Sequence, residues 1–157
     1  MFNKPRSLRK KLAKRKYNIP DSFSYWLYHM IVSLFIVKKY NPHYVIRDDV
    51  RKCKGPCFII WNHQARIDHA FLEQATYPKK INIIAAYTEF FRSHLHTVFK
   101  MGDVIPKKIY NMDIASMRAI RSVIRKGGCV AFSAEGMHSI YGTNQPVVPG
   151  TGGFLKR

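Results

Sequence analysis

The chain has 157 residues, which is enough for one domain with a hydrophobic core and too short for two domains of ordinary size. With 46% hydrophobic residues and no low-complexity segment, the composition excludes a disordered protein. Its 27 lysines and arginines and 9 acidic residues give a formal charge of +18. That excess must be solvated or meet an anion, such as nucleic acid, anionic lipid or a phosphorylated substrate.

The cysteine content indicates a reducing compartment. Cys53, Cys57 and Cys129 form no even set that would build a disulfide framework, and Cys53 and Cys57 lack a second pair for a metal site. The first apolar stretch comes too late for a secretory signal, and no small-residue cleavage site follows it. We therefore expect a cytoplasmic protein.

Residues 1–20 form a basic arm. Its first sixteen positions contain eight basic residues and no acidic one: Lys4, Arg6, Arg9, Lys10, Lys11, Lys14, Arg15 and Lys16. Two interpretations fit this pattern. The arm is either a disordered tail that aids solubility or a contact for a membrane or for nucleic acid.

Residues 21–41 predict a helix that associates with a membrane. Asp21 or Ser22 can cap it, and its uncharged part of about fifteen residues is shorter than the ~20 needed to span a bilayer. Aromatic residues lie near one end and lysines at the other: Tyr25, Trp26, Tyr28, Lys38 and Lys39. The alternative is a helix packed against the domain core. With a basic arm directly upstream, we favour the surface of an anionic membrane, on its cytoplasmic face, as a peripheral or monotopic protein.

Beyond Pro42, strands alternate with helices. We expect a short edge strand within 43–50 and further strands at 57–61, 81–86, 104–105 and 129–132. Helices are expected at 67–75, 90–101 and 113–126. The last helix has an amphipathic pattern, with one apolar face made of Ile114, Met117, Ile120, Val123 and Ile124. This alternation predicts an α/β fold with a mostly parallel sheet flanked by helices.

The apolar run 58–61 ends at Asn62 and His63, and a carboxylate, Asp68, follows five residues after the histidine. On one straight helix these positions would be rotated about 140° apart. If His63 lies on the loop and Asp68 on the first helical turn, the carboxylate can hold one ring nitrogen and leave the other free as a general base. The alternative is a partly buried histidine beside a helix-capping aspartate.

Three predicted strands end in polar residues: Asn62-His63, Pro106-Lys107-Lys108 and Ser133-Ala134-Glu135-Gly136. In open α/β sheets, ligands bind outside the carboxyl ends of the strands. A base, two cations and a carboxylate-glycine turn on one rim would suit a phosphorylated substrate whose hydroxyl is deprotonated.

At these positions the chain resembles the glycerophospholipid acyltransferase family, the 1-acylglycerol-3-phosphate acyltransferases and their relatives. Residues 62–68, Asn-His-Gln-Ala-Arg-Ile-Asp, look like the N-H-x-x-x-x-D motif. Residues 88–91 and 102–108 are similar to the second block, and residues 132–139, Phe-Ser-Ala-Glu-Gly-Met-His-Ser, to the F-P-E-G-T-R-S block. The similar region runs from about residue 42 to residue 154.

The resemblance implies transfer of a fatty acyl group from acyl-CoA or acyl-carrier protein to a hydroxyl of a lysophospholipid, in phospholipid biosynthesis. His63 would deprotonate the hydroxyl and Asp68 would orient the imidazole. The residues implied to bind the substrate are Lys107, Lys108, Glu135, Gly136 and His138. No cofactor, metal or nucleic acid is expected.

Four features depart from the family pattern, and they concern the acceptor more than the reaction. Lys108 and His138 stand where the family has arginines, Met137 replaces a threonine, and Ser133-Ala134 replaces Phe-Pro. A lysine keeps the charge but loses the bidentate fork that suits phosphate. Family members also continue into a further strand after the third block. We therefore expect an acyltransferase domain over 42–157 that is incomplete at its C-terminus, with an unpaired sheet edge.

Two other functions compete with this hypothesis. The chain could be a catalytically inactive basic module that binds membranes or nucleic acid, although it has no helix-turn-helix, zinc-finger or RNA-recognition signature. It could also be a metal-dependent hydrolase using His63, Asp68 and His69, but a second ligand cluster is missing.

Overall fold

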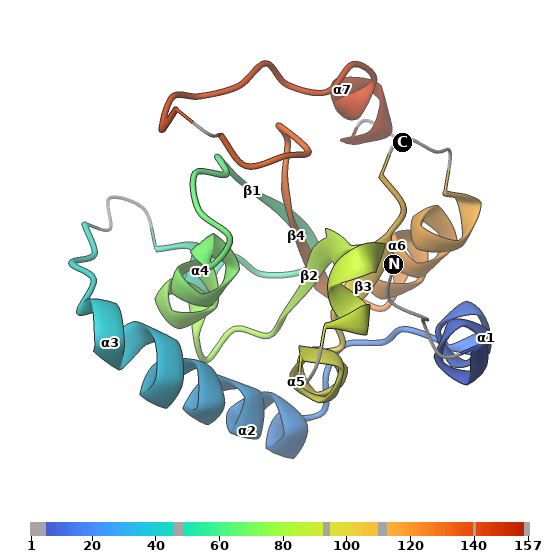
Figure 1. Cartoon of the computed structure of the whole chain (residues 1–157), viewed down its shortest axis with the longest axis horizontal. Helices are drawn as coiled ribbons and strands as arrows, with labels where there is room; N and C mark the ends of the chain where they lie inside the picture. Colours follow the sequence, from blue (N-terminus) through green and yellow to red (C-terminus); the bar gives the residue numbers. More distant parts are fainter. Residues whose placement is uncertain (1–5, 46–48, 93–94, 110–112, 140, 156–157) are drawn as a thin grey trace.

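Four parallel strands form the centre of the computed structural model, which describes residues 6–45, 49–92, 95–109, 113–139 and 141–155. The sheet has the order β1-β4-β2-β3, shown in Figure 1. The strands are β1 (Cys57–Trp61), β2 (Ile81–Ala86), β3 (Ile105–Lys107) and β4 (Cys129–Ser133). The predicted α/β class with a parallel sheet is therefore confirmed.

Helices cover both faces of the sheet because successive strand residues point to opposite sides. On one face, Ile59, Ile83 and Ala131 pack in a core that also contains residues of α4 (Asp68–Thr76) and α5 (Leu95–Met101). On the other face, Val130 and Ile105 pack in a second core with α6 (Ile114–Arg125).

The helix predicted in the N-terminal region is long and continuous. It comprises α2 (Ser22–Val32), a π-helical segment η1 (Ser33–Val37) and α3 (Lys38–Tyr40), and the carboxylate of Asp21 caps it by accepting the N–H of Ser24 at 2.9 Å. Its inner side, with Tyr25, Tyr28 and Val32, is buried against the domain core. No helix among the described residues is long and apolar enough to cross a bilayer.

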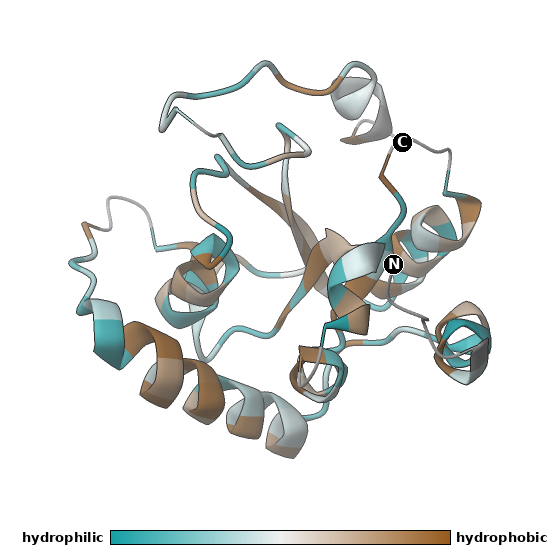
Figure 2. Ribbon diagram, in the orientation of Figure 1, coloured by the Kyte–Doolittle hydropathy of each residue, from teal (hydrophilic) through white to brown (hydrophobic). Residues whose placement is uncertain are grey.

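The opposite side of this helix is exposed. We call it the outer apolar face, and its members are Phe23, Trp26, Leu34 and Phe35. Figure 2 shows how hydrophobic residues follow α2 and η1 along the edge of the molecule. Core packing, the alternative weighed from the sequence, therefore accounts for one side of the helix only.

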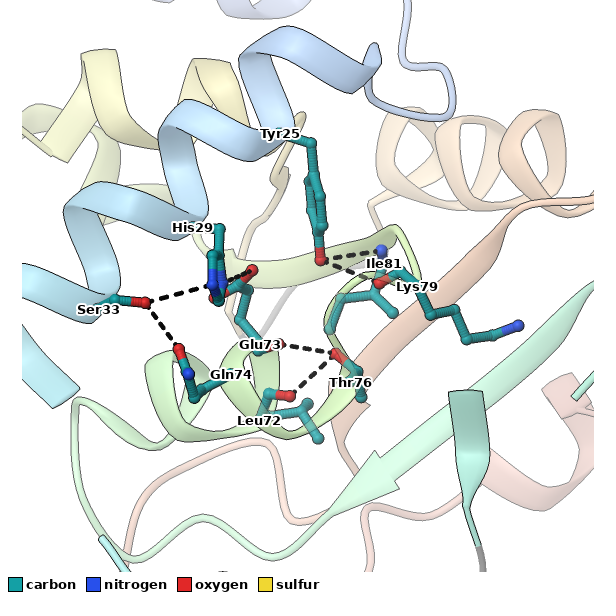
Figure 3. Close-up of polar contacts among 9 residues, drawn as sticks. All are labelled: Tyr25, His29, Ser33, Leu72, Glu73, Gln74, Thr76, Lys79 and Ile81. Carbon is teal, nitrogen blue, oxygen red and sulfur yellow. Dashed lines mark hydrogen bonds and ion pairs between the residues drawn. The ribbon is translucent and has the colours of Figure 1, made fainter. Parts of the chain in front are cut away.

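A polar network joins α2 to α4 beneath the long helix (Figure 3). The ring of His29 lies with Nδ1 3.2 Å from the buried carboxyl of Glu73, and the hydroxyl of Ser33 donates to Gln74 at 2.7 Å. The phenol of Tyr25 accepts the N–H of Ile81 at 3.3 Å, at the start of β2. The network fixes the long helix relative to the sheet.

The basic arm is ordered in its described part, so the disordered-tail interpretation is wrong there. Residues Arg6–Lys14 form α1, whose Leu12 side chain is buried. After the helix, the guanidinium of Arg15 pairs with Asp103 at 2.5 Å, and the ring of Tyr17 is buried against the core beside α6. Among the described residues of the arm, Lys10, Lys11, Lys14 and Lys16 are exposed on the surface.

Two predicted elements differ from the structure. In the described parts of 43–50 there is no strand, and the chain forms instead a 3-10 turn, η2 (Val50–Lys52); residues 46–48 lie outside the description. The single helix expected at 90–101 is a 3-10 turn, η3 (Tyr87–Phe91), followed by the shorter α5. The segment after β4 is a loop that ends in α7 (Thr151–Leu155) and adds no strand within the described residues.

The buried face of α6 is rotated from the predicted one. Ile120 and Val123 are buried as expected, but Ile114 and Met117 are 56% and 39% exposed. Ser116 is buried in the first turn instead, because its hydroxyl donates to the carbonyl oxygen of Pro106 on β3 at 2.5 Å. A polar tether to the strand therefore overrides the hydrophobic pattern in the first turn.

Candidate active site

The register of the sheet brings the first and third sequence blocks together. β1 and β4 are paired in parallel with Trp61 opposite Ser133, so residues two positions later, His63 and Glu135, emerge side by side from the same rim. The main-chain N–H of His63 donates to Oε2 of Glu135 at 3.0 Å. The carbonyl of His63 accepts the N–H of Ser139 at 2.7 Å.

His63 and Asp68 are in direct contact. Nδ1 of the ring lies 3.1 Å from Oδ2 of Asp68, and both side chains are about one-fifth exposed (23% and 20%). Asp68 is the first residue of α4, and the loop turns back so that the same Oδ2 accepts the N–H groups of Gln64 and Ala65 at 2.7 and 2.8 Å. The loop-to-helix geometry expected from the five-residue spacing is thus present.

This contact determines which ring nitrogen is available for chemistry. An ionised carboxylate only accepts hydrogen bonds, so a favourable contact requires a proton on Nδ1 of His63. Nε2 then carries the lone pair and can act as a base. Three hydrogen-bond contacts converge on one oxygen of Asp68, which fixes this carboxyl group between the loop and the ring.

Gly136 forms the turn that returns the chain from β4. Its φ of 71° lies in the left-handed region, and an added Cβ would stand 2.9 Å from Cγ2 of Val148. The N–H of Val148 also donates to the carbonyl of Ala134 at 2.9 Å. The glycine therefore permits both the turn and the close approach of the following loop.

His138 lies beside the histidine-aspartate pair. Its ring centroid is 5.7 Å from that of His63, with the two planes inclined at 68°, and its side chain is exposed. A group bound at His138 would therefore lie next to the ring of His63.

Lys107 and Lys108 lie on the same rim but at the far edge of the sheet. The strand order places two strands between β3 and β1, which is a separation of about 14 Å at ordinary strand spacing. Both side chains are exposed, and the N–H of Lys108 donates to Asp113 at 2.8 Å, which attaches this turn to α6. The lysines therefore do not adjoin His63.

Arg66 lies inside the first sequence block, between His63 and Asp68. In the structure its guanidinium pairs with Glu89 at 2.9 Å, which links the His63 loop to the second block. His69 has its hydrogen-bond contact outside the pair, with Nδ1 3.1 Å from the carbonyl of Arg66, and its ring is edge-on to Phe99. The described residues contain no group of three or more side chains that could hold a metal ion.

A groove next to Asp68 was not predicted. It has a volume of about 280 Å³. Its lining residues are mainly aromatic and aliphatic: Tyr44, Trp61, Asn62, Gln64, Asp68, Phe71, Leu72 and Ala75. The signal in the sequence is the aromatic residue at the end of β1 together with the apolar side of α4.

Comparison with known protein families identifies the family of the chain. A family model described as Acyltransferase matches residues 36–156, which is most of the chain and includes all three sequence blocks. No curated protein and no solved structure is significantly similar to the chain. The chain belongs to the acyltransferase family, the glycerophospholipid acyltransferases, and is an enzyme of the acyltransferase type.

Proposed function

We propose that this enzyme transfers a fatty acyl group from acyl-CoA or acyl-carrier protein to a hydroxyl of a lysophospholipid such as 1-acylglycerol-3-phosphate, in phospholipid biosynthesis. The contact between Nδ1 of His63 and Asp68 at the carboxyl end of β1 carries the proposal. In a member of an acyltransferase family, an imidazole held at one nitrogen by a carboxylate supplies the base that the reaction requires.

The proposed reaction needs no covalent intermediate on the enzyme. Nε2 of His63 removes the proton of the acceptor hydroxyl while the hydroxyl oxygen attacks the thioester carbonyl. The imidazolium, stabilised by Asp68, then returns the proton to the leaving thiolate as the C–S bond breaks. The products are the acyl ester and the free thiol.

The acceptor's phosphate would be held by cations of the rim. His138 lies close enough to adjoin a phosphate near the reacting hydroxyl, whereas Lys107 and Lys108 would reach it only with extended side chains. The substrate-binding role that the family resemblance implies for these three residues and for Gly136 stays part of the proposal.

The groove beside Asp68 would take an acyl chain. It is apolar, and it opens next to the pair that performs the chemistry. Apolar walls with a few polar groups are typical of sites for small apolar ligands.

We further propose that the enzyme works at the cytoplasmic face of an anionic membrane. The outer apolar face exposes large side chains, with Phe35 74% and Phe23 70% exposed, and Lys38 and Lys39 follow it as exposed cations. Aromatic and aliphatic groups beside lysines favour the headgroup region of a bilayer.

The direct test is transfer of a radiolabelled acyl chain to lysophosphatidic acid in mixed vesicles by the full chain. Transfer to lysophospholipids with choline and ethanolamine head groups, and to glycerol 3-phosphate itself, is compared to identify the preferred acceptor. Acyl-CoA and acyl-carrier protein are compared as donors. Absence of transfer with every pair would contradict the proposal.

A further inference from the structure

We propose that Glu135 is a positioning residue for His63, which it holds by the main chain, rather than a ligand of the acceptor. This inference rests on the proposed function of the His63–Asp68 pair. It departs from the role that the family resemblance implies for Glu135.

The hydrogen bonds of the loop are the first argument. Three consecutive N–H groups at the start of this loop donate to carboxylates. The N–H of His63 donates to Glu135, and those of Gln64 and Ala65 donate to Asp68. Asp68 thus holds the ring and the later part of the loop, while Glu135 holds the residue that bears the base. A buried N–H that loses its acceptor favours another backbone conformation.

The position of β1 is the second argument. Within the described residues this strand pairs only with β4, so the turn after β4 is the neighbouring backbone that can fix the His63 loop from the sheet side. The carboxylate of Glu135 accepts the N–H of His63, and the N–H of Ser139 donates to the carbonyl of His63. Both main-chain groups of the base are therefore held by one turn.

This turn is itself fastened, so it can act as a rigid support. Ser139 is 5% exposed, and its hydroxyl oxygen accepts the N–H groups of Tyr141 and Thr143 at 3.2 and 3.1 Å. The carbonyl of Ala134 accepts from Val148. Glu135 on a fixed turn can place the backbone of His63 more precisely than a side chain on a mobile loop could.

Charge is the third argument. The acceptor in the proposed function carries a phosphate, and a carboxylate repels an anion at short range. Oε2 of Glu135 already accepts a hydrogen bond at 3.0 Å, so its charge is directed toward the protein backbone. The carboxylate therefore suits an N–H group of the enzyme better than a phosphorylated ligand.

The test compares Glu135→Ala, Glu135→Gln and Glu135→Asp with Asp49→Asn, which removes a carboxylate whose ion pair is with Arg51 in its own loop. Two quantities are measured on the full chain. Steady-state kinetics give kcat and KM for lysophosphatidic acid, and amide hydrogen exchange gives the protection of the His63 N–H.

We expect Glu135→Ala and Glu135→Asp to lower kcat about a hundredfold, because a misplaced base is costly, with KM changed by less than about twofold. Glu135→Gln keeps an accepting oxygen at the same reach and should restore most of kcat. Exchange at His63 should accelerate in the Ala and Asp variants and stay slow in the Gln variant and in Asp49→Asn.

A rise in KM with kcat intact would overturn the inference, as would a Gln variant as impaired as the Ala variant, or unchanged exchange at His63. If the wild-type chain transfers no acyl group, the proposed function fails. The exchange measurement then decides separately whether Glu135 holds the loop. If the Ala variant does not fold, the Asp and Gln variants provide the same comparison.

Discussion

The imidazole of His29 on α2 lies 3.2 Å from the carboxyl of Glu73 on α4, and that carboxyl is fully buried. Burial raises the pKa of Glu73 to about 8 and lowers the pKa of His29. At neutral pH the proton therefore resides on Glu73, which donates it to the neutral ring. Because α4 begins with Asp68, this pair connects the long N-terminal helix to the candidate active site.

Glu73→Gln should remove a pH dependence of stability. The unfolded carboxyl ionises near its ordinary pKa of 4.5, whereas the folded one keeps its proton up to about pH 8. Between these values unfolding releases a proton, so the free energy of unfolding falls as pH rises, by at most about 1.4 kcal/mol per pH unit. A glutamine still donates to His29 and does not titrate.

Urea denaturation at about pH 5.5 and about pH 7.5 measures this slope. The Gln variant should lose the fall in stability between these two pH values, because only the opposing rise from the lowered pKa of His29 remains, and it should match or exceed the stability of the wild type at the higher pH. Asp49→Asn, which changes a partly exposed carboxylate paired with Arg51, should retain the wild-type slope. A Gln variant with the wild-type slope would show that Glu73 is not the group responsible.

His138→Arg should improve binding of a phosphorylated acceptor. A guanidinium can grip phosphate with two parallel hydrogen bonds and is always charged. The ring it replaces lies 5.7 Å from that of His63, so the new group would lie near the reacting hydroxyl. We expect KM for lysophosphatidic acid to fall about tenfold, in line with the strength of charged hydrogen bonds.

The control acceptor for this variant is monoacylglycerol, which has no phosphate. Its KM should stay as in the wild type. An equal fall in KM for both acceptors would mean that position 138 acts on something other than phosphate.

Phe35→Ser should weaken membrane binding without unfolding the protein. This side chain is 74% exposed on the outer apolar face, so its removal costs little in the folded core. Burying a phenyl group in a membrane contributes about 1.5–3 kcal/mol, so vesicle partitioning should fall about tenfold or more.

Flotation with anionic vesicles measures the partitioning, and thermal denaturation confirms that the fold is intact. Val147→Ser, which changes a side chain 59% exposed on the loop after β4, serves as the matched control and should float as the wild type does. Equal flotation of the Phe35 variant and the control would remove the membrane role of this face.

The parts of the fold that could be predicted are those in which local pattern and tertiary packing agree. The strands at 57–61 and 81–86 are short apolar runs bounded by turn residues, which is the pattern typical of strands in a parallel sheet. The position of Asp21 as a helix cap could also be read locally, because a cap acts within one turn.

The parts that could not be predicted depend on contacts between distant residues. The rotation of α6 follows from the hydrogen bond of Ser116 to Pro106, ten positions earlier. The ordering of the basic arm depends on the pair of Arg15 with Asp103, 88 positions away. Neither contact leaves a periodic signal in the sequence.

The candidate site shows the same division. The contact of His63 with Asp68 spans five residues and could be expected from a loop followed by a helix. The distance of Lys108 from that pair could not, because it is set by the strand order β1-β4-β2-β3, which the sequence does not determine. The hydrogen bond of Glu135 to the backbone of His63 follows from the register of β1 with β4.

The decisive measurement is acyl transfer to lysophosphatidic acid by His63→Ala compared with the wild type at equal folded concentration. The side chain is 23% exposed and makes its polar contact with Asp68, so the variant should remain folded by circular dichroism. Transfer should fall by about a thousandfold or more, because the general base is lost. Transfer by the folded variant at the wild-type rate would contradict a mechanism in which His63 is the base.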